Sequence, residues 1–187
     1  MGLFDALFGR TRVPSGKTDQ LFALSTAALD IETRLASHYL GQSAIILRAV
    51  DNSAYETIER DIHDVLNLGG RDLAITAKML TDNLGFRWII MSGPALEDAI
   101  NGLHLSAELV KQAGYGDSLL AAMFAFDPDW YLIYNYRRGT FYPFVPRPGQ
   151  RRDESREFRI REVLAPSLPI EKDPERWYPL WDPPLGP

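Results

Sequence analysis

The segment Leu119–Phe126 constrains the fold more than any other part of the sequence, because every one of its residues is apolar. Neighbouring side chains of a β-strand point to opposite faces, so a strand of this composition must be covered on both sides. The tight turn Asp127-Pro128-Asp129 follows, which predicts that the chain returns as a second, antiparallel strand. One face of the first strand carries mainly small side chains. Either helices cover both faces, or this small-residue face contacts a second copy of the chain; we expect the second arrangement, a homodimer.

The rest of the hydrophobic pattern predicts an α+β fold, in which helices pack on an antiparallel sheet. Apolar side chains recur every three to four residues in the predicted helices and every second residue in the strand predicted at 29–35. The predicted order is helix, two strands, helix, two strands, helix, two strands, helix. The elements are a short helix at 19–24, strands at 29–35 and 44–50, a helix from Ser53 to Gly69-Gly70, a hairpin of strands 73–79 and 86–91, a long helix that opens at Ser92-Gly93-Pro94, two strands around 127–129, and a helix at 153–164.

Segment 26–35 also fits a helix, so the strand at 29–35 has a competing interpretation. The predicted order as a whole is similar to that of the α+β dimers of type III secretion chaperones and YbjN-like proteins. This is an analogy of topology and implies no function. Three regions are expected along the chain: an amphipathic helix with a linker at 1–17, the α+β domain at 18–146, and a tail rich in proline and aromatic residues at 147–187 that packs on the domain.

Composition excludes several classes of protein. The chain has no cysteine, which rules out a disulfide scaffold, a cysteine-based zinc site and a cysteine nucleophile. Its net charge of −5 argues against nucleic acid as a partner, since phosphate neutralisation needs clustered cations. No apolar run reaches the roughly 20 residues of a membrane span, and the N-terminus lacks the pattern of a secretion signal. We expect a cytoplasmic protein, free or peripheral at the inner face of the membrane.

The first ten residues present one apolar side, formed by Leu3, Phe4, Leu7 and Phe8 at helical spacing. A basic linker follows. Such a short helix either docks on its own domain or enters the lipid boundary while the linker meets anionic headgroups. These four side chains are the candidate membrane contact.

A search for catalytic chemistry finds little. The three histidines are His38, His63 and His104, and none forms the Glu-x-x-His pattern of a di-iron helix. The sequence contains no nucleophile-elbow, zincin or Walker motif. We therefore predict no catalytic residue, no cofactor and no metal site.

One segment, Tyr134–Pro146, does suggest binding, because two arginines stand among several aromatic residues just before Gly139. Guanidinium groups stack on aromatic rings and bind carboxylate or phosphate through paired hydrogen bonds. The candidate residues for binding a partner or an anion are Arg137, Arg138 and Tyr142, with Trp177 of the tail. The alternative is architectural: Gly139 supplies an unusual backbone angle while the aromatic residues fill the core.

Four stretches together resemble the PspA-associated family called PspAB: residues 1–10, Asp19–Leu24, Arg137–Phe144 and Arg176–Trp181. Members are encoded near PspA, a membrane-binding phage-shock protein, and sometimes near a membrane metalloprotease. The resemblance implies a role in the envelope-stress response and implies no enzymatic activity. It leads to the hypothesis of a non-enzymatic adaptor that binds PspA or a related stress component. The alternative is a protein, or an enzyme, that holds a small anionic ligand with Arg137, Arg138 and Tyr142.

Overall fold

A computed structural model describes residues 17–49, 57, 60–62, 64 and 74–185 of the chain. The main feature is an antiparallel sheet of six strands in the order β2-β3-β1-β4-β5-β6. The predicted α+β class is therefore confirmed. The helical and turn elements are η1 (Asp19–Phe22), α1 (Ala23–Arg34), α3 (Leu96–Gln112), η2 (Gly116–Ser118), α4 (Glu154–Leu164) and η3 (Pro174–Arg176); the strands are β1 (Tyr39–Arg48), β2 (Thr76–Thr81), β3 (Phe86–Ser92), β4 (Leu119–Phe126), β5 (Trp130–Asn135), β6 (Thr140–Phe144), β7 (Pro146–Arg147) and β8 (Arg151–Arg152).

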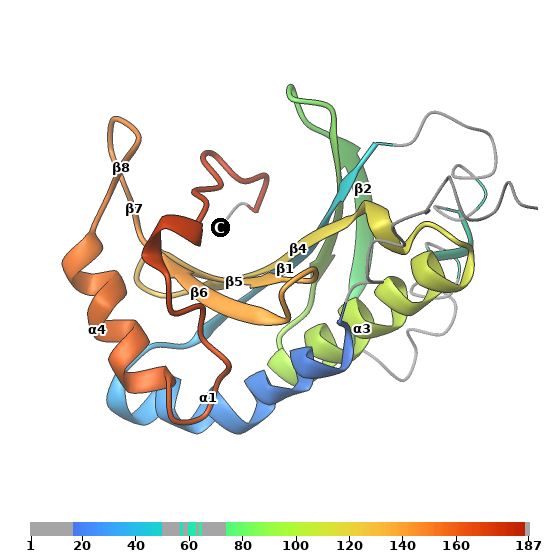
Figure 1. Ribbon diagram of the computed structural model, residues 1–187. Helices are drawn as coiled ribbons and strands as arrows, with labels where there is room; N and C mark the ends of the chain where they lie inside the picture. Colours follow the sequence, from blue (N-terminus) through green and yellow to red (C-terminus); the bar gives the residue numbers. More distant parts are fainter. Residues whose placement is uncertain (1–16, 50–56, 58–59, 63, 65–73, 186–187) are drawn as a thin grey trace, which may run out of the picture.

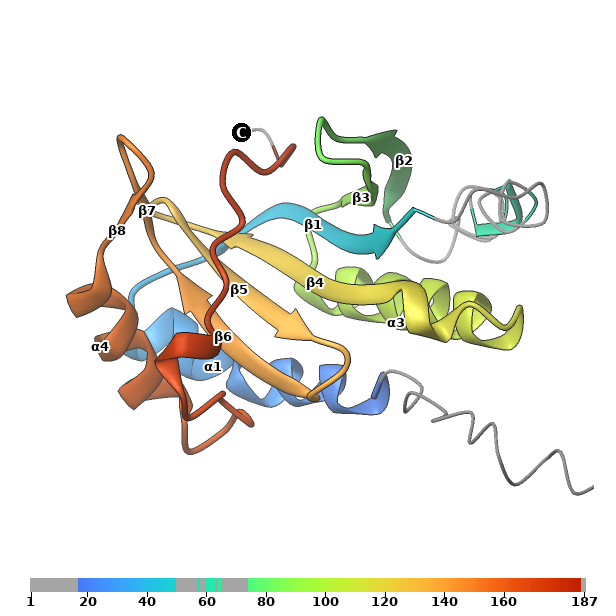
Figure 2. The same cartoon turned by 45° about the horizontal axis from the view of Figure 1, so that its top comes forward.

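Helices α1 and α3 cover one face of the sheet. The C-terminal tail, a name used from here on for residues 177–185, crosses the other face (Figure 1). The larger apolar cluster fills the space between these helices and the sheet. Helix α4 packs beside α1 and β6. Figure 2 shows the same layers from another side, with β4 running along the middle of the sheet. Because β4 has a layer on each face, its uniformly apolar composition is explained within one chain.

The strand predicted at 29–35 is wrong, since these residues belong mostly to helix α1. Leu24, Ala27 and Ile31 follow one another at helical spacing and are buried, whereas Leu29 is 68% exposed. The alternation of apolar residues was therefore a poor guide, because burial follows the helical period here. The competing helical interpretation of 26–35 is the correct one.

The other predicted elements that fall on described residues are present. β2 and β3 form the hairpin around Asp82–Gly85, and β4 pairs with β5 across the turn at 127–129. Asp153 caps α4, since its carboxylate accepts a hydrogen bond from the Arg156 backbone N–H at 3.0 Å. Pro94 lies just before the N-cap of α3 and not in its first turn. Strand β6 was not predicted, and the helix expected from Ser53 lies largely outside the described residues.

The face of β4 that was assigned to a homodimer is covered by the chain's own tail, so that assignment is corrected. Ala121 is 9% exposed and Met123 is fully buried. Both belong to a second apolar cluster that includes Trp177 and Leu185 of the tail. A second copy is not needed to cover this face, and homodimerisation stays a prediction without an assigned surface.

Candidate functional site

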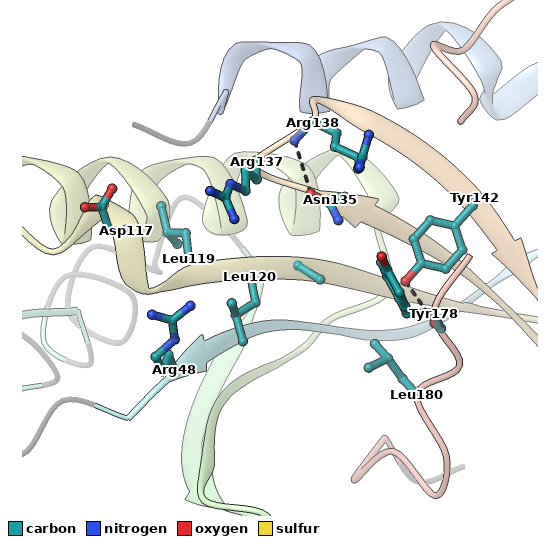
Figure 3. Close-up of a pocket in the computed structure, with 12 residues that line it drawn as sticks. Arg48, Asp117, Leu119, Leu120, Asn135, Arg137, Arg138, Tyr142, Tyr178 and Leu180 are labelled. Atoms are coloured by element: carbon teal, nitrogen blue, oxygen red, sulfur yellow. Dashed lines mark hydrogen bonds between the residues drawn. The ribbon is translucent and has the colours of Figure 1, made fainter. Parts of the chain in front are cut away.

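A pocket of about 540 Å³ lies on the tail side of the sheet, between the end of β1, the start of β4, the β5–β6 turn and the tail (Figure 3). One part of its lining is polar and the other is apolar. The polar lining consists of Arg48, Asp117, Asn135, Arg137 and Arg138. The apolar and aromatic lining consists of Leu119, Leu120, Ala121, Tyr142, Tyr178 and Leu180. We call this cavity the arginine pocket.

The register of the sheet explains why three arginines from distant segments meet. Leu47 of β1 pairs with Leu119 at the start of β4, so Arg48 lies at that end of the sheet. β5 returns alongside β4 and brings Asn135 opposite Ala121. The β5–β6 turn and the end of β1 therefore lie at the same end of the sheet, one on each side of β4.

The turn that carries Arg137 and Arg138 depends on Gly139. Its φ of +71° lies in the left-handed region that favours glycine. Its N–H donates to the Asn135 backbone oxygen at 2.8 Å, and the Asn135 side-chain oxygen accepts from the Arg138 N–H at 3.1 Å. The two arginine side chains are thus presented by a tight, internally bonded turn, which agrees with the unusual backbone angle expected for Gly139.

The pocket has an excess of positive charge. Three arginines line it, against the single carboxylate of Asp117. Arg138 Nη1 is 3.5 Å from the carboxylate of Glu171, a residue outside the pocket lining. Within the described part of the chain, Arg48 and Arg137 have no side-chain hydrogen bond or ion pair, and both are exposed. These two guanidinium groups are available to an oxyanion from solution.

The Tyr142 hydroxyl is hydrogen-bonded within the chain. Its hydroxyl donates to the backbone oxygen of Tyr178 at 3.0 Å, and burial raises the pKa of this hydroxyl well above its usual range. The hydroxyl is therefore a permanent donor that holds the tail in place. The Tyr142 ring still lines the pocket, so this residue shapes the cavity and fixes one of its walls.

Trp177 is not brought into the pocket. It is 3% exposed, and its indole N–H donates to the Glu171 backbone oxygen at 3.0 Å. Its ring packs against Phe158 of α4, with centroids 5.6 Å apart. Trp177 anchors the start of the tail, while the following residue, Tyr178, reaches the pocket.

Sequence reasoning missed Arg48, Asp117 and Tyr178. Arg48 is the last residue of β1, and only the strand order shows that this end of β1 lies at the same end of the sheet as the β5–β6 turn. Asp117 lies in a short turn after α3, where nothing distinguishes it from other surface carboxylates. The signal for Tyr178 was the aromatic tail, from which Trp177 was selected.

The histidines that the structure describes lie away from the pocket. His38 is near Asp127, with 3.4 Å between Nδ1 and Oδ2, and His104 packs against Phe22. Among the described residues, no group of three metal-ligating side chains forms a possible metal site. His63 and the four apolar side chains Leu3, Phe4, Leu7 and Phe8 lie outside the described residues. Each helix that is described is too short or too polar to cross a lipid bilayer.

The fold and the pocket define an α+β protein with a solvent-exposed cationic cavity at one end of its sheet. The chain belongs to the family PspA associated protein B, whose model matches residues 1–185. The resemblance noted from the four sequence stretches is thereby confirmed. Comparisons with curated proteins and with solved structures gave no match.

Proposed function

We propose that this chain is a non-enzymatic accessory protein that binds an acidic, partly apolar segment of PspA, or of a related stress component, in the arginine pocket. The observation that carries the proposal is the convergence of Arg48, Arg137 and Arg138 on one cavity with an apolar floor. The family description names association with PspA and so supports the choice of partner.

The two halves of the pocket suit an amphipathic peptide segment. Carboxylates of the partner would meet Arg48 and Arg137, whose guanidinium groups can each form paired hydrogen bonds with a carboxylate. Apolar side chains of the partner would cover Leu120, Ala121 and Leu180. A segment that carries both kinds of group is held by charge at one end and by burial of apolar surface at the other.

The pocket chemistry supports binding better than catalysis. Guanidinium groups stay protonated in proteins and cannot act as general bases. The buried hydroxyl of Tyr142 is committed to Tyr178. Asp117 lacks a histidine, lysine or nucleophile beside it in the pocket lining. We therefore infer a contact surface and no reaction.

Lys17, the first described residue, is bonded to the turn that carries Arg137 and Arg138. Its backbone N–H donates to the Tyr136 oxygen at 2.8 Å, and its Nζ donates to the Arg138 oxygen at 3.2 Å. Residues 1–16, with the candidate membrane contact of Leu3, Phe4, Leu7 and Phe8, precede Lys17 in the sequence and lie outside the described residues.

A titration of the purified chain with purified PspA tests the proposal. We expect Arg137→Gln and Arg48→Gln each to weaken binding about 10-fold or more, as a charge-assisted contact is worth about 1.5–3 kcal/mol. Arg159→Gln is the matched control, because Arg159 is exposed on α4 outside the pocket. Equal affinities for all four proteins, or no binding at all, would exclude the proposal.

A binding protein for a small anion is the second candidate, since about 540 Å³ is within the usual range for small-molecule sites. Inorganic phosphate and citrate are suitable probes. A rise in melting temperature with either anion, abolished by Arg137→Gln, together with no binding of PspA, would favour this candidate.

A further inference from the structure

The last part of the tail crosses the sheet in an unusual way. After η3 the chain turns onto the face opposite α1 and α3 and runs across β4 and β1 towards the β2–β3 hairpin (Figures 1 and 2). Pro184 lines one cavity together with Gln42 of β1 and Lys78 of β2. The tail thus covers an apolar face that would otherwise be open to solvent.

The first part of this tail is hydrogen-bonded to the domain. Arg152 donates to the Trp177 backbone oxygen at 2.5 Å, and Tyr142 donates to the Tyr178 oxygen at 3.0 Å. With the indole N–H of Trp177 bonded to Glu171, the chain is fixed as far as Tyr178.

Residues 179–185 are held differently. In the described structure this stretch forms no backbone or side-chain hydrogen bond. Three of its seven residues are proline, which has no N–H to donate. It is held by apolar contacts alone: the Trp181 ring packs on Phe144 with centroids 5.1 Å apart, and Leu185 is 6% exposed within the second apolar cluster.

We propose that the sheet face under residues 179–185 is a second interaction surface, which accepts an extended partner segment rich in proline, leucine and aromatic side chains. The chain's own residues 179–185 are the competing occupant. The surface selects this chemistry because it contacts side chains and leaves the backbone of its occupant unpaired. Proline loses no backbone hydrogen bond in such a site, because an extended proline-containing segment needs no hydrogen-bonded neighbour.

Displacement of this stretch requires no hydrogen bond to be broken, so only its apolar contacts oppose a competing segment. A tethered segment nevertheless has an effective concentration in the millimolar range. A partner segment therefore binds the intact chain weakly and binds more tightly once the tail is removed. The two surfaces adjoin each other: Leu120, Ala121, Tyr142 and Leu180 line the arginine pocket and also belong to, or pack on, the second apolar cluster, whereas Arg48 and Arg137 line the pocket alone.

The test uses a fluorescein-labelled peptide with the sequence of residues 179–187 as the probe and a scrambled peptide as its control. Binding is measured by fluorescence anisotropy to the full chain and to a chain that ends at Tyr178, which keeps the hydrogen-bonded anchors. A full-length variant with Trp181→Ala and Leu185→Asp releases the tail without shortening the chain. This second variant covers the case in which the shortened chain does not fold, which its circular dichroism spectrum shows.

We expect the shortened chain and the released variant to bind the peptide at least 10-fold more tightly than the intact chain. The scrambled peptide should bind none of them at the same concentration. Equal affinity for all three proteins, absence of binding to both altered proteins, or equal binding of the scrambled peptide would overturn the inference. The effect of Arg48→Gln and Arg137→Gln on PspA binding reports on the arginine pocket, because neither substitution alters the apolar cluster under the tail. Failure of one proposal therefore does not decide the other.

Discussion

The guanidinium group of Arg152 contacts both carboxylate oxygens of Glu157, a residue that is only 2% exposed. Arg152 Nε donates to Oε1 at 3.0 Å, and Nη2 lies 2.9 Å from Oε2. The same carboxylate accepts the backbone N–H of Val145 at 2.8 Å. Because Arg152 also donates to the Trp177 oxygen, this pair joins the end of β6, helix α4 and the start of the tail.

Loss of either member of the pair should destabilise the protein strongly. In Arg152→Leu the Glu157 carboxylate stays buried without its counter-ion, and we expect a loss of about 3–5 kcal/mol in the free energy of unfolding. Urea denaturation measures this change. Arg159→Gln on α4, the helix that carries Glu157, is the control and should remain within about 0.5 kcal/mol of the parent protein. If Arg152→Leu matches that control, the pair does not hold these elements together.

A pH dependence follows from Asp153, the N-cap of α4. Its hydrogen bond from the Arg147 side chain, with further help from the Arg156 N–H, holds the pKa of the Asp153 carboxyl below its usual range. The folded-state pKa is therefore lower than the unfolded-state pKa. The stability that this carboxylate contributes is present above the unfolded-state value, about 3.9, and is lost as the pH falls through the folded-state value.

Asp153→Asn isolates the charge, because asparagine caps a helix about as well as aspartate. We expect the melting temperature of the parent protein to fall more steeply than that of Asp153→Asn as the pH decreases from about 6 to about 3. Differential scanning calorimetry over this range gives the two curves. Parallel curves would show that Asp153 contributes nothing to acid sensitivity.

Gly93 should tolerate no side chain. An added Cβ would lie 2.7 Å from Ile75 Cγ2 and 3.2 Å from Ile75 Cα, so the backbone of a neighbouring segment must move. We expect Gly93→Ala to cost about 1–3 kcal/mol of stability. At Gly116 the nearest atom would be the flexible Lys111 side chain, 3.1 Å away. Gly116→Ala should therefore change the urea midpoint much less, and similar costs for both would contradict this account.

The proposed membrane contact of Leu3, Phe4, Leu7 and Phe8 is tested by flotation with liposomes that contain anionic lipid. We expect the full chain to partition with the liposomes more than a chain that lacks residues 1–12, because apolar side chains and basic linker residues act together. A variant with Leu3, Phe4, Leu7 and Phe8 replaced by serine keeps the linker charges and separates the two contributions. Equal partitioning of the full and shortened chains would remove the membrane contact.

Much of the fold could be predicted from local signals. The apolar composition of β4, the turn at 127–129 and the helical pattern at 153–164 each specify a structure through their own residues. The strand prediction for 29–35 was wrong because the apolar residues there fit both the period of a strand and that of a helix. Only packing against the sheet selects the helix. The prediction that a second copy covers β4 was wrong because the covering segment is distant in sequence: 50 or more residues separate this strand from the tail.

The candidate site also combines residues that the local sequence predicts with residues that only the fold brings together. Arg137 and Arg138 could be selected because they stand together in an aromatic segment before a glycine. Arg48 could not, because its position in the pocket follows from the pairing of β1 with β4. The commitment of the Tyr142 hydroxyl to the Tyr178 oxygen likewise depends on where the tail runs.

Site-directed photo-crosslinking tests the central claim, that PspA binds in the arginine pocket, most directly. The chain has no cysteine, so a single cysteine that carries benzophenone can be placed at Leu120 in the pocket floor or at Leu29 on the exposed side of α1. We predict that PspA crosslinks to the probe at position 120, that Arg137→Gln reduces this product, and that position 29 gives little. Crosslinking from position 29 in place of position 120, or from both equally, would contradict the claim.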